Sequence, residues 1–547
     1  MAGVTGHTED WKSLPWKEFR CNVFRLQKRI YQAQCRGDFK RVCNLQRLLL
    51  RSWSAHCLAV RQVTQDNRGK RTPGVDGVAR LTPKQRLTLA KALRDLDRRP
   101  DPIRRIYIPK ANGEQRPLGI PTMRDRAQQA LVKLALEPEW EAKFEPNSYG
   151  FRPGRSVHDT MVAIFNFIRR KPKYVLDADI EKCFDRINHE ALLAKLDAIP
   201  EINKLVRGWL KAGIMDNGEM LYPEMGTPQG GPLSPLLANV ALHGLETALV
   251  ASLPQRKRPA IIRYADDLVV LHKDLDTLRI LQERTETWLK EIGLRLKPSK
   301  TRVVHTLYAH EGQPGFDFLG FTIRQFPVGK YRTKTYRGEV GFKTIIKPSK
   351  SAQERHMRKV SAAIRRHRGS NQTALIAELN PMIRGWATYY RTCVAKHTFT
   401  RLDHEVSYKL YKWAIYRHRN KSARWRQERY GVRVLGRYDF SDGQSTLVKH
   451  GDTRIQRHVK VIGQKSPFDG DWTYWAERLG KDPTKPKRVT TLLKRQNGRC
   501  PYCGLRFMAT EVMEVHHKDG NHRNNRHSNW VLLHGHCHDQ VHGTKYL

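Results

Sequence analysis

The chain has 547 residues, which is too many for one hydrophobic core, and we expect three to five domains. Its 100 Lys and Arg against 53 Asp and Glu give a net charge of +47, which indicates a polyanionic partner, and nucleic acid is the usual one. No apolar run approaches the roughly 20 residues that span a bilayer, and the first residues lack a secretory hydrophobic segment, so an intracellular protein is expected.

The N-terminal region is predicted to be helical and basic. Residues 11–65 place apolar positions at helical spacing among many Arg and Lys, which predicts two or three amphipathic helices. The Gly-rich basic stretch over 67–78 is expected to be a loop. Two strands around the turn "ANGE" are predicted over 103–121, followed by helices from Met123 and from near Val157.

The middle of the chain alternates predicted strands and helices, which indicates an α+β core. A strand running into a turn is predicted over 174–184, a hairpin over 258–273 and a single strand over 316–323. A tight turn feeds a helix within 226–246, and another helix follows the hairpin over 274–292.

The C-terminal part changes character twice. Residues 351–430 read as helical and strongly basic, residues 431–485 as irregular strands and loops, and "KDPTKPKR" (481–488) as a linker. Beyond the linker the sequence is rich in His and Cys. Cys500 and Cys503 have the C-x₂-C spacing of two thiolates on one Zn²⁺, and His534 with Cys537 repeats it, which predicts a Cys₃His zinc site.

Two adjacent carboxylates, Asp266 and Asp267, lie in the centre of the predicted hairpin "IIRYADDLVV". Phosphoryl transfer onto a growing chain uses two Mg²⁺ about 4 Å apart, and Mg²⁺ prefers carboxylate oxygens. Asp179, at the end of a neighbouring strand, would complete such a site, and Asp177 is its rival. The alternative is a solvated turn, but the apolar flanks would bury it, and plain turns more often use Asn-Gly or Asp-Gly.

Several motifs occur in an order that resembles one family. "RYADDLVVL" resembles the YxDD hairpin of reverse transcriptases, "DADIEKCFDRI" their first catalytic strand, and "GTPQGGPLSPLLANVAL" the motif that cradles template and nucleotide. "NRGKRTPGVDG" and "NPMIRGWATYYR" resemble the template-contacting loop and the thumb signature of group II intron-encoded reverse transcriptase–maturases. The resemblance covers nearly the whole chain.

The resemblance implies a role for individual polymerase residues. Asp179, Asp266 and Asp267 would hold the two Mg²⁺. The residues that would contact an incoming dNTP are Lys110, Arg116, Phe184, Gln229, Gly230 and Lys300. The Phe184 ring would clash with a 2′-hydroxyl and select dNTPs, whereas an ordinary core Phe is the alternative. Solvated basic residues are the alternative for the Lys and Arg, and a plain turn is the alternative for the glycine motif.

The C-terminal His residues resemble an HNH, or ββα-metal, nuclease. The resemblance implies that His517 is the general base. It also implies that Asn529 fixes the loop and orients His517. The residues that would ligate one divalent metal are His516, His538 and His542. The family more often has Cys where His534 stands, so His536 remains an alternative zinc ligand. A purely structural zinc ribbon is the alternative for the whole module.

The resemblance also predicts the architecture, which is a right-hand polymerase with fingers, palm and helical thumb, a DNA-binding segment and the HNH module. The predicted domains are a basic helical extension (1–85), fingers and palm (86–325), thumb or maturase domain (326–415), DNA-binding domain (416–485) and endonuclease domain (486–547). The implied partners are group II intron RNA, target DNA and dNTPs, in a cytoplasmic or organellar ribonucleoprotein. A domesticated splicing factor without catalysis and a retron or defence-type reverse transcriptase are the alternatives.

Overall fold

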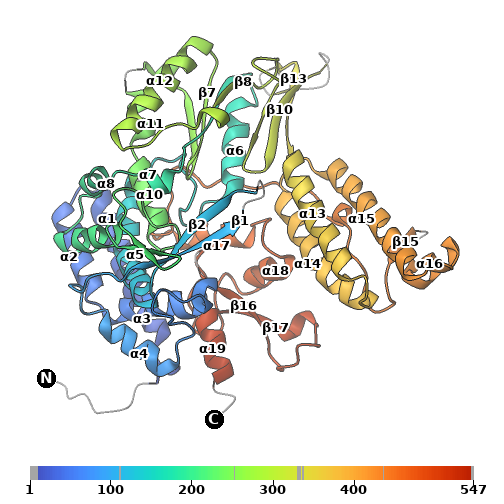
Figure 1. Ribbon diagram of the computed structural model, residues 1–547, viewed down its shortest axis with the longest axis horizontal. Coiled ribbons are helices and arrows are strands. Elements are labelled where there is room, and N and C mark those ends of the chain that lie inside the picture. The colour runs from blue at the N-terminus through green and yellow to red at the C-terminus, as the bar shows by residue number, and fades with distance from the viewer. Residues whose placement is uncertain are drawn as a thin grey trace.

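The computed structural model describes residues 10–109, 113–251, 253–328, 334–335, 338–434, 437–509 and 511–543. Lys110 and part of the predicted turn after it lie outside these ranges. Figure 1 shows the N-terminal helices, blue, at the lower left, a separate helical bundle, yellow to orange, at the right, and the C-terminal module, red, below and between the two. The mixture of sheets and helices confirms the predicted α+β class, while the five domain boundaries stay a prediction.

The N-terminal region forms a helical layer packed on one long helix, as its amphipathic pattern predicts. The elements of this layer are α1 (Trp16–Cys35), α2 (Phe39–Leu50), α3 (Trp53–Arg61), η1 (Gln62–Asp66), η2 (Arg68–Arg71), α4 (Pro83–Ala92) and the long α5 (Met123–Lys143). Their apolar faces meet in one core that includes the fully buried Ile30, Leu49, Val60 and Leu131. Most Arg and Lys of these helices are left on the outside of the layer.

A small sheet projects from this layer, with strand order β2-β1-β4-β5. Its strands are β1 (Ile103–Pro109), β2 (Gln115–Ile120), β4 (Ile214–Asp216) and β5 (Glu219–Leu221). The predicted hairpin is confirmed, because β1 and β2 pair antiparallel from Arg104↔Ile120 to Pro109↔Gln115. The described ends of both strands near the turn are exposed, so Arg116 reaches into solvent.

The central sheet has the strand order β6-β7-β3-β8 and carries the carboxylates. Its strands are β3 (Tyr174–Asp179), β6 (Ala260–Tyr264), β7 (Asp267–His272) and β8 (Arg302–His305). The surrounding helices are α6 (Val157–Ile168), α7 (Cys183–Arg186), α8 (His189–Leu196), α9 (Pro200–Leu210), α10 (Ser234–Leu242), α11 (Leu245–Val250), η3 (Gln255–Lys257), α12 (Leu275–Glu291) and η4 (Pro298–Lys300). Continuous apolar runs make β7 a buried strand, with Leu268 to Leu271 fully inaccessible.

The prediction of one strand over 316–323 is wrong. The segment folds into a hairpin, β9 (Phe316–Phe318) and β10 (Phe321–Pro327), closed by Leu319 and Gly320 with φ of 49° and 84°. Two consecutive positive φ values make the tight turn that fits the strand twist, and glycine adopts one without strain. β10 also pairs with β13 (Phe342–Pro348), and the short β11 (Lys334–Thr335) and β12 (Gly338–Glu339) lie between them in sequence.

The helical prediction for 351–430 is confirmed. The bundle consists of α13 (Lys350–Arg366), α14 (Gln372–Tyr390), α15 (Lys396–Arg417) and α16 (Ala423–Tyr430), followed by the hairpin β14 (Gly431–Val434) and β15 (Arg437–Phe440). Its core holds Val360, Leu375, Leu379 and Leu402. Several of its aromatic residues are buried, among them Tyr390 and Trp413, so they serve packing, whereas its basic residues lie outside.

The predictions of irregular structure over 431–485 and of a linker over 481–488 are wrong in part. After η5 (His450–Asp452), Asp471 caps a regular helix, α17 (Trp472–Gly480). α18 (Lys487–Arg495) begins inside the predicted linker, and Leu479 shares a core with Leu492. The remaining elements are β16 (Met513–His517), η6 (His527–Asn529), β17 (Trp530–His534) and α19 (Gly535–Gly543). The C-terminal module is therefore packed directly onto α17.

Candidate active sites: a carboxylate cluster and two His and Cys clusters

The two acidic motifs meet at one end of the central sheet. Asp179 ends β3 and lies opposite Asp267, which begins β7. Asp266 occupies the two-residue turn between β6 and β7, and its carbonyl accepts a hydrogen bond from Ile180 N at 3.3 Å. The predicted strand end and the predicted hairpin thus bring their carboxylates together. Asp177 is instead held by Arg302, whose Nε and Nη2 donate to Oδ2 at 3.1 and 3.0 Å.

The carboxylate cluster is electrostatically strained. Burial, followed by the charges of Asp266 and Asp179, raises the pKa of Asp267 to about 7. Burial likewise raises the pKa of Asp266, although the charge of the nearby Arg116 acts in the opposite direction. Lys300 Nζ lies 2.7 Å from Asp179 Oδ2, and this hydrogen bond raises the pKa of the lysine. Like charges that lie together and half-buried in this way are stabilised by a nearby cation, and hard carboxylate oxygens suit Mg²⁺.

The carboxylates are spaced more widely than ligands of a single ion. In the described part of the chain, three or more His, Cys, Asp or Glu ligand atoms lie within 4.8 Å of one another only in the C-terminal module. Asp179, Asp266 and Asp267 are not among these groups.

Buried residues outside the predicted set support the hairpin turn. Arg263 Nη1 donates to Asn239 Oδ1 at 3.0 Å and to the Ala265 carbonyl at 3.3 Å. Asn239 Nδ2 in turn donates to the Gly150 carbonyl at 2.8 Å, and a Cβ on Gly150 would lie 2.3 Å from Ala265 N. Burial lowers the pKa of Arg263 to about 10. Sequence reasoning missed these residues, although an Arg inside the apolar run "IIRY" is a visible signal.

The predicted nucleotide-contacting residues lie beside this sheet, apart from Lys110, which is outside the described residues. Phe184 and Gln229 line a small cavity of about 140 Å³, and Gln229 Nε2 donates to Asp185 Oδ1 at 3.2 Å. Gly230 has φ 137°, and a Cβ there would lie 2.3 Å from the Gly119 carbonyl. Arg116 is exposed on β2. The glycine motif is thus pressed against β2 of the small sheet.

The first cluster of the C-terminal module consists of Cys500, Cys503, His534 and Cys537, all buried, with ligand atoms within 4.8 Å of one another. Cys503 Sγ lies 3.3 Å from His534 Nδ1. His536 lies outside the cluster and stacks on His534, with ring centroids 5.1 Å apart. Burial lowers the pKa of His536 to about 2. Of the two candidate fourth ligands, the geometry therefore favours His534, and a Cys₃His set suits Zn²⁺.

The second cluster brings together His516 on β16 and His538 and His542 on α19, again within 4.8 Å. His538 and His542 are one helical turn apart, so they project from the same face of the helix. Glu514 Oε2 lies 2.9 Å from His538 Nδ1, which favours the Nδ1–H tautomer and leaves Nε2 toward the cluster. β16 and β17 pair antiparallel and α19 follows them, which is a ββα arrangement.

The adjacent His517 lies on the other side of β16. Trp530 Nε1 donates to His517 Nε2 at 3.1 Å, so a neutral ring carries its proton on Nδ1. Proton abstraction by Nε2 therefore requires the Trp530 contact to open. No hydrogen bond joins the side chains of Asn529 and His517, both of which are described. The Asn529 amide instead exchanges hydrogen bonds with Asp519 N and Oδ1 at 3.1 and 2.9 Å and fixes the loop that follows His517.

Four segments of the chain match described protein families. Residues 11–93 match the N-terminal domain of reverse transcriptase, and residues 108–323 match reverse transcriptase (RNA-dependent DNA polymerase). Residues 353–431 match the group II intron maturase-specific domain, and residues 500–544 match HNH endonuclease. Within the described residues, no helix has the length and apolarity that crossing a membrane requires.

Individual relatives agree with these matches. Protein YkfC of Escherichia coli (strain K12) is 32% identical over 344 residues, which cover 55% of this chain and 88% of YkfC. The group II intron-encoded protein LtrA of Lactococcus lactis subsp. cremoris is 34% identical over 218 residues, 38% of this chain and 36% of LtrA. Maturase-like protein 1 of Euglena gracilis is 26% identical over 420 residues, 73% of this chain and 84% of that protein. With its polymerase, maturase and HNH segments in this order, the chain belongs to the group II intron-encoded reverse transcriptase/maturases that carry a C-terminal HNH endonuclease domain.

Proposed function

We propose that the protein copies its intron RNA into DNA at a centre formed by Asp179, Asp266 and Asp267, primed by a 3′-hydroxyl of the target DNA. The observation that carries this proposal is the register of β3 and β7, which sets Asp179 opposite Asp267 beside the turn that bears Asp266. When bound there, two Mg²⁺ lower the pKa of the attacking 3′-hydroxyl and neutralise the leaving pyrophosphate. The three carboxylates hold these ions, and Lys300 moves from Asp179 to the pyrophosphate.

The neighbouring residues select and orient the nucleotide. Phe184 blocks a 2′-hydroxyl, and the backbone around Gly230 approaches the template base pair closely because the glycine has no side chain. Gln229 lines the same pocket. Arg116 and Lys110, on the fingers hairpin, bind the triphosphate as a planar fork and as a point charge. The effect of the Arg116 charge on the pKa of Asp266 supports its closeness to the centre.

The C-terminal module cleaves one strand of the DNA target and so exposes the priming 3′-hydroxyl. In this proposal His516, His538 and His542 hold one divalent metal, which steadies the charge that develops on the phosphodiester. His517 removes a proton from the attacking water once Trp530 releases its Nε2. Cys500, Cys503, His534 and Cys537 hold a structural Zn²⁺ that ties both halves of the module together.

The helical bundle binds the intron RNA and promotes its splicing. The support comes from α15, where Tyr408, Tyr411 and Tyr416 are 44–55% exposed along the helix. Lys412 lies over the Tyr408 ring at 4.6 Å, and Arg419 over the Tyr416 ring at 5.8 Å. Exposed aromatic rings with adjacent cations suit unpaired bases and phosphates of structured RNA.

Replacement of a single carboxylate tests the polymerase centre. We expect Asp266→Ala to lower primer extension on an RNA template by at least about 100-fold, the scale expected when one group that stabilises transition-state charge is removed. Intron RNA affinity should change by less than a few-fold, because the bundle is untouched. Asp177→Ala is the matched control: it also removes an Asp of the central sheet, but one that pairs with Arg302. Undiminished extension by Asp266→Ala refutes the proposal.

A further inference from the structure

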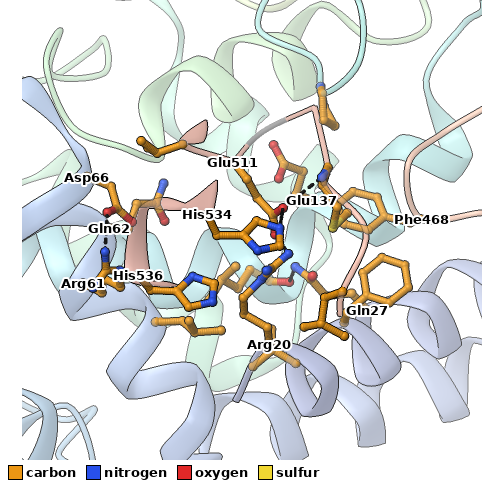
Figure 2. Close-up of a pocket in the computed structure, with 18 of the residues that line it drawn as sticks. Arg20, Gln27, Arg61, Gln62, Asp66, Glu137, Phe468, Glu511, His534 and His536 are labelled. Carbon is orange, nitrogen blue, oxygen red and sulfur yellow. Dashed lines mark hydrogen bonds and ion pairs between the residues drawn. The ribbon is translucent and has the colours of Figure 1, made fainter. Parts of the chain in front are cut away.

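The N-terminal helices and the C-terminal module enclose a shared cavity of about 820 Å³ (Figure 2). Arg20 from α1 and Arg61 from α3 face it from one side, and Glu511, His534 and His536 face it from the other. The two sides are separated by more than 400 positions in the sequence, yet they are joined by several ion pairs and hydrogen bonds. Those contacts end on the residues that surround the two His and Cys clusters.

The first set of contacts leads to the Cys₃His cluster. His534 turns Nδ1 toward Cys503 Sγ at 3.3 Å, and its Nε2 lies 3.3 Å from Glu511 Oε2. Glu511 is held in place by an ion pair with Arg20 and by a hydrogen bond from Met508 N at 2.8 Å. His534 Nε2 makes no hydrogen bond to this carboxylate, but the negative charge beside it favours the proton on that nitrogen and leaves Nδ1 for a metal. Arg20 thereby fixes the carboxylate that faces a predicted zinc ligand.

The second set of contacts leads to the helix that carries His538 and His542. Asp539 on α19 accepts from Arg61 Nη2 at 2.7 Å and from Gln65 Nε2 at 3.3 Å. The Arg61 side chain is only 6% exposed, and its guanidinium lies over the Trp16 ring at 5.1 Å. Figure 1 shows α19 beside the N-terminal helices. The buried Arg61 of α3 thus holds α19 at Asp539, a position between the two predicted metal ligands of that helix.

The contact of Arg20 with Glu511 is costly to break, because both side chains are largely buried. Arg20 and Glu511 have side chains 13% and 19% exposed. If the module moved away while both groups stayed sequestered, each would be left without its partner, and an uncompensated buried charge is strongly destabilising. Docking therefore favours the arrangement in which Glu511 and Asp539 hold the metal-binding groups in place. By thermodynamic linkage, metal binding favours docking to the same extent.

We propose that the N-terminal helices of the reverse transcriptase form the outer shell of the endonuclease's metal sites, with Arg20 and Arg61 as positioning residues. This inference rests on the proposed metal sites of the module and adds a dependence of those sites on a distant part of the chain. The endonuclease is then fully assembled only while it is docked on the polymerase. Nicking of the target and extension of the nick are thereby confined to one complex.

The rate of zinc release from the purified full-length protein tests this inference. Zinc would be followed with a chromophoric chelator after addition of EDTA, in Arg20→Ala, Arg20→Lys and Glu511→Gln. We expect Arg20→Ala and Glu511→Gln to release zinc about 10- to 100-fold faster than wild type, as for other groups that orient a metal ligand. Arg20→Lys should restore most of the retention. Arg25→Ala is the matched control, since Arg25 is a residue of α1 that lines the same cavity but makes no ion pair with the described residues of the module.

The double variant Arg20→Ala/Glu511→Gln tests whether Arg20 acts on the zinc site through Glu511, as a relay, or whether the two residues affect zinc release independently. In a relay the double variant releases zinc no faster than the faster of the two single variants, because either change breaks the same chain of contacts. Multiplied effects, or wild-type release rates in all single variants, overturn the inference. A wild-type protein that holds no zinc overturns it together with the proposed zinc site. Primer extension on RNA should stay within about two-fold in every variant, which separates these results from failure of the polymerase proposal and from misfolding.

Discussion

At the residue scale, the carboxylate cluster explains why a protein of net charge +47 gathers three Asp in one place. Sequence reasoning identified Asp179, Asp266 and Asp267 because each follows or precedes an apolar strand. It left Asp177 as a rival, because alternation along a strand puts both on one face. The pairing of Asp177 with Arg302, 125 positions away, favours Asp179 as the third carboxylate, and this pairing depends on tertiary structure. The support from Arg263 to the turn was missed for the same reason.

The raised pKa of Asp267 predicts a pH-dependent requirement for Mg²⁺. With the pKa near 7, the folded protein holds a proton that the unfolded chain releases near pH 4, so this group makes folding less favourable as pH rises through that window. A bound cation competes with the same proton. The Mg²⁺ concentration that gives half-maximal primer extension should therefore fall as pH rises from about 6 to about 7.5 and then level off. An unchanged half-maximal concentration across this range contradicts the prediction.

At the scale of elements, the N-terminus of α6 joins the polymerase to the C-terminal part of the chain. Asp159 closes a capping box with Ser156, as its position in the first turn predicts. The same carboxylate accepts from Val461 N at 2.8 Å and Arg478 Nη2 at 2.6 Å, and lies 3.2 Å from His458 Nε2. The cap is visible in the sequence, but the long-range partners are not. Helix α17, which supplies Arg478, was missed with them.

Replacement of Asp159 tests this junction. Burial alone would raise the pKa of Asp159, but the hydrogen bond with His458 and the charge of Arg478 outweigh it and hold the pKa below its usual value. The resulting stabilisation is present above the unfolded pKa of about 4 and is lost as pH falls through the folded pKa. Asp159→Asn should lower the free energy of unfolding by about 3 kcal/mol at pH 7, because it leaves a buried cation unpaired.

Chemical denaturation at pH 7 measures this effect. Asp276→Asn serves as the control, because Asp276 is also acidic and in the first turn of a helix but lies nearer the surface. The control should change stability by less than about 0.5 kcal/mol. A decrease of equal size in both variants means that only the helix dipole is involved, and that the junction with His458 and Arg478 contributes nothing.

At the scale of the whole molecule, local patterns predicted most helices and the central strands, because amphipathic spacing and apolar runs specify them. They did not predict which distant segments touch. The turn at Leu319 and Gly320 lies in an apolar run that looks continuous, and the contact of Arg61 with Asp539 spans nearly the whole chain. The resemblance to one family named the modules, but the docking of the nuclease on the N-terminal helices comes from the structure alone.

The excess of positive charge attracts RNA. Variants that remove the same charge at different positions can test whether RNA binding depends on where the positive charges lie or only on their number. If α15 and the residues after it bind phosphates, Lys412→Gln/Arg419→Gln should weaken binding to intron RNA. The slope of log Kd against log salt should fall by about 1.4, because each phosphate neutralised on single-stranded RNA accounts for about 0.7 of that slope. Lys204→Gln/Arg207→Gln removes the same net charge from α9, where both residues pair with Asp97 and Glu190.

Binding measured by filter retention between about 50 and 500 mM KCl distinguishes the two variants. The α9 variant should keep the wild-type slope, because screening at these salt concentrations confines a charge to its surroundings within about 10 Å. Equal slopes for both variants would mean that net charge alone attracts the RNA. A changed slope only in the Lys412/Arg419 variant places phosphate binding on the face that bears Tyr408 and Tyr416, and the stacked rings then account for the part of the affinity that salt does not remove.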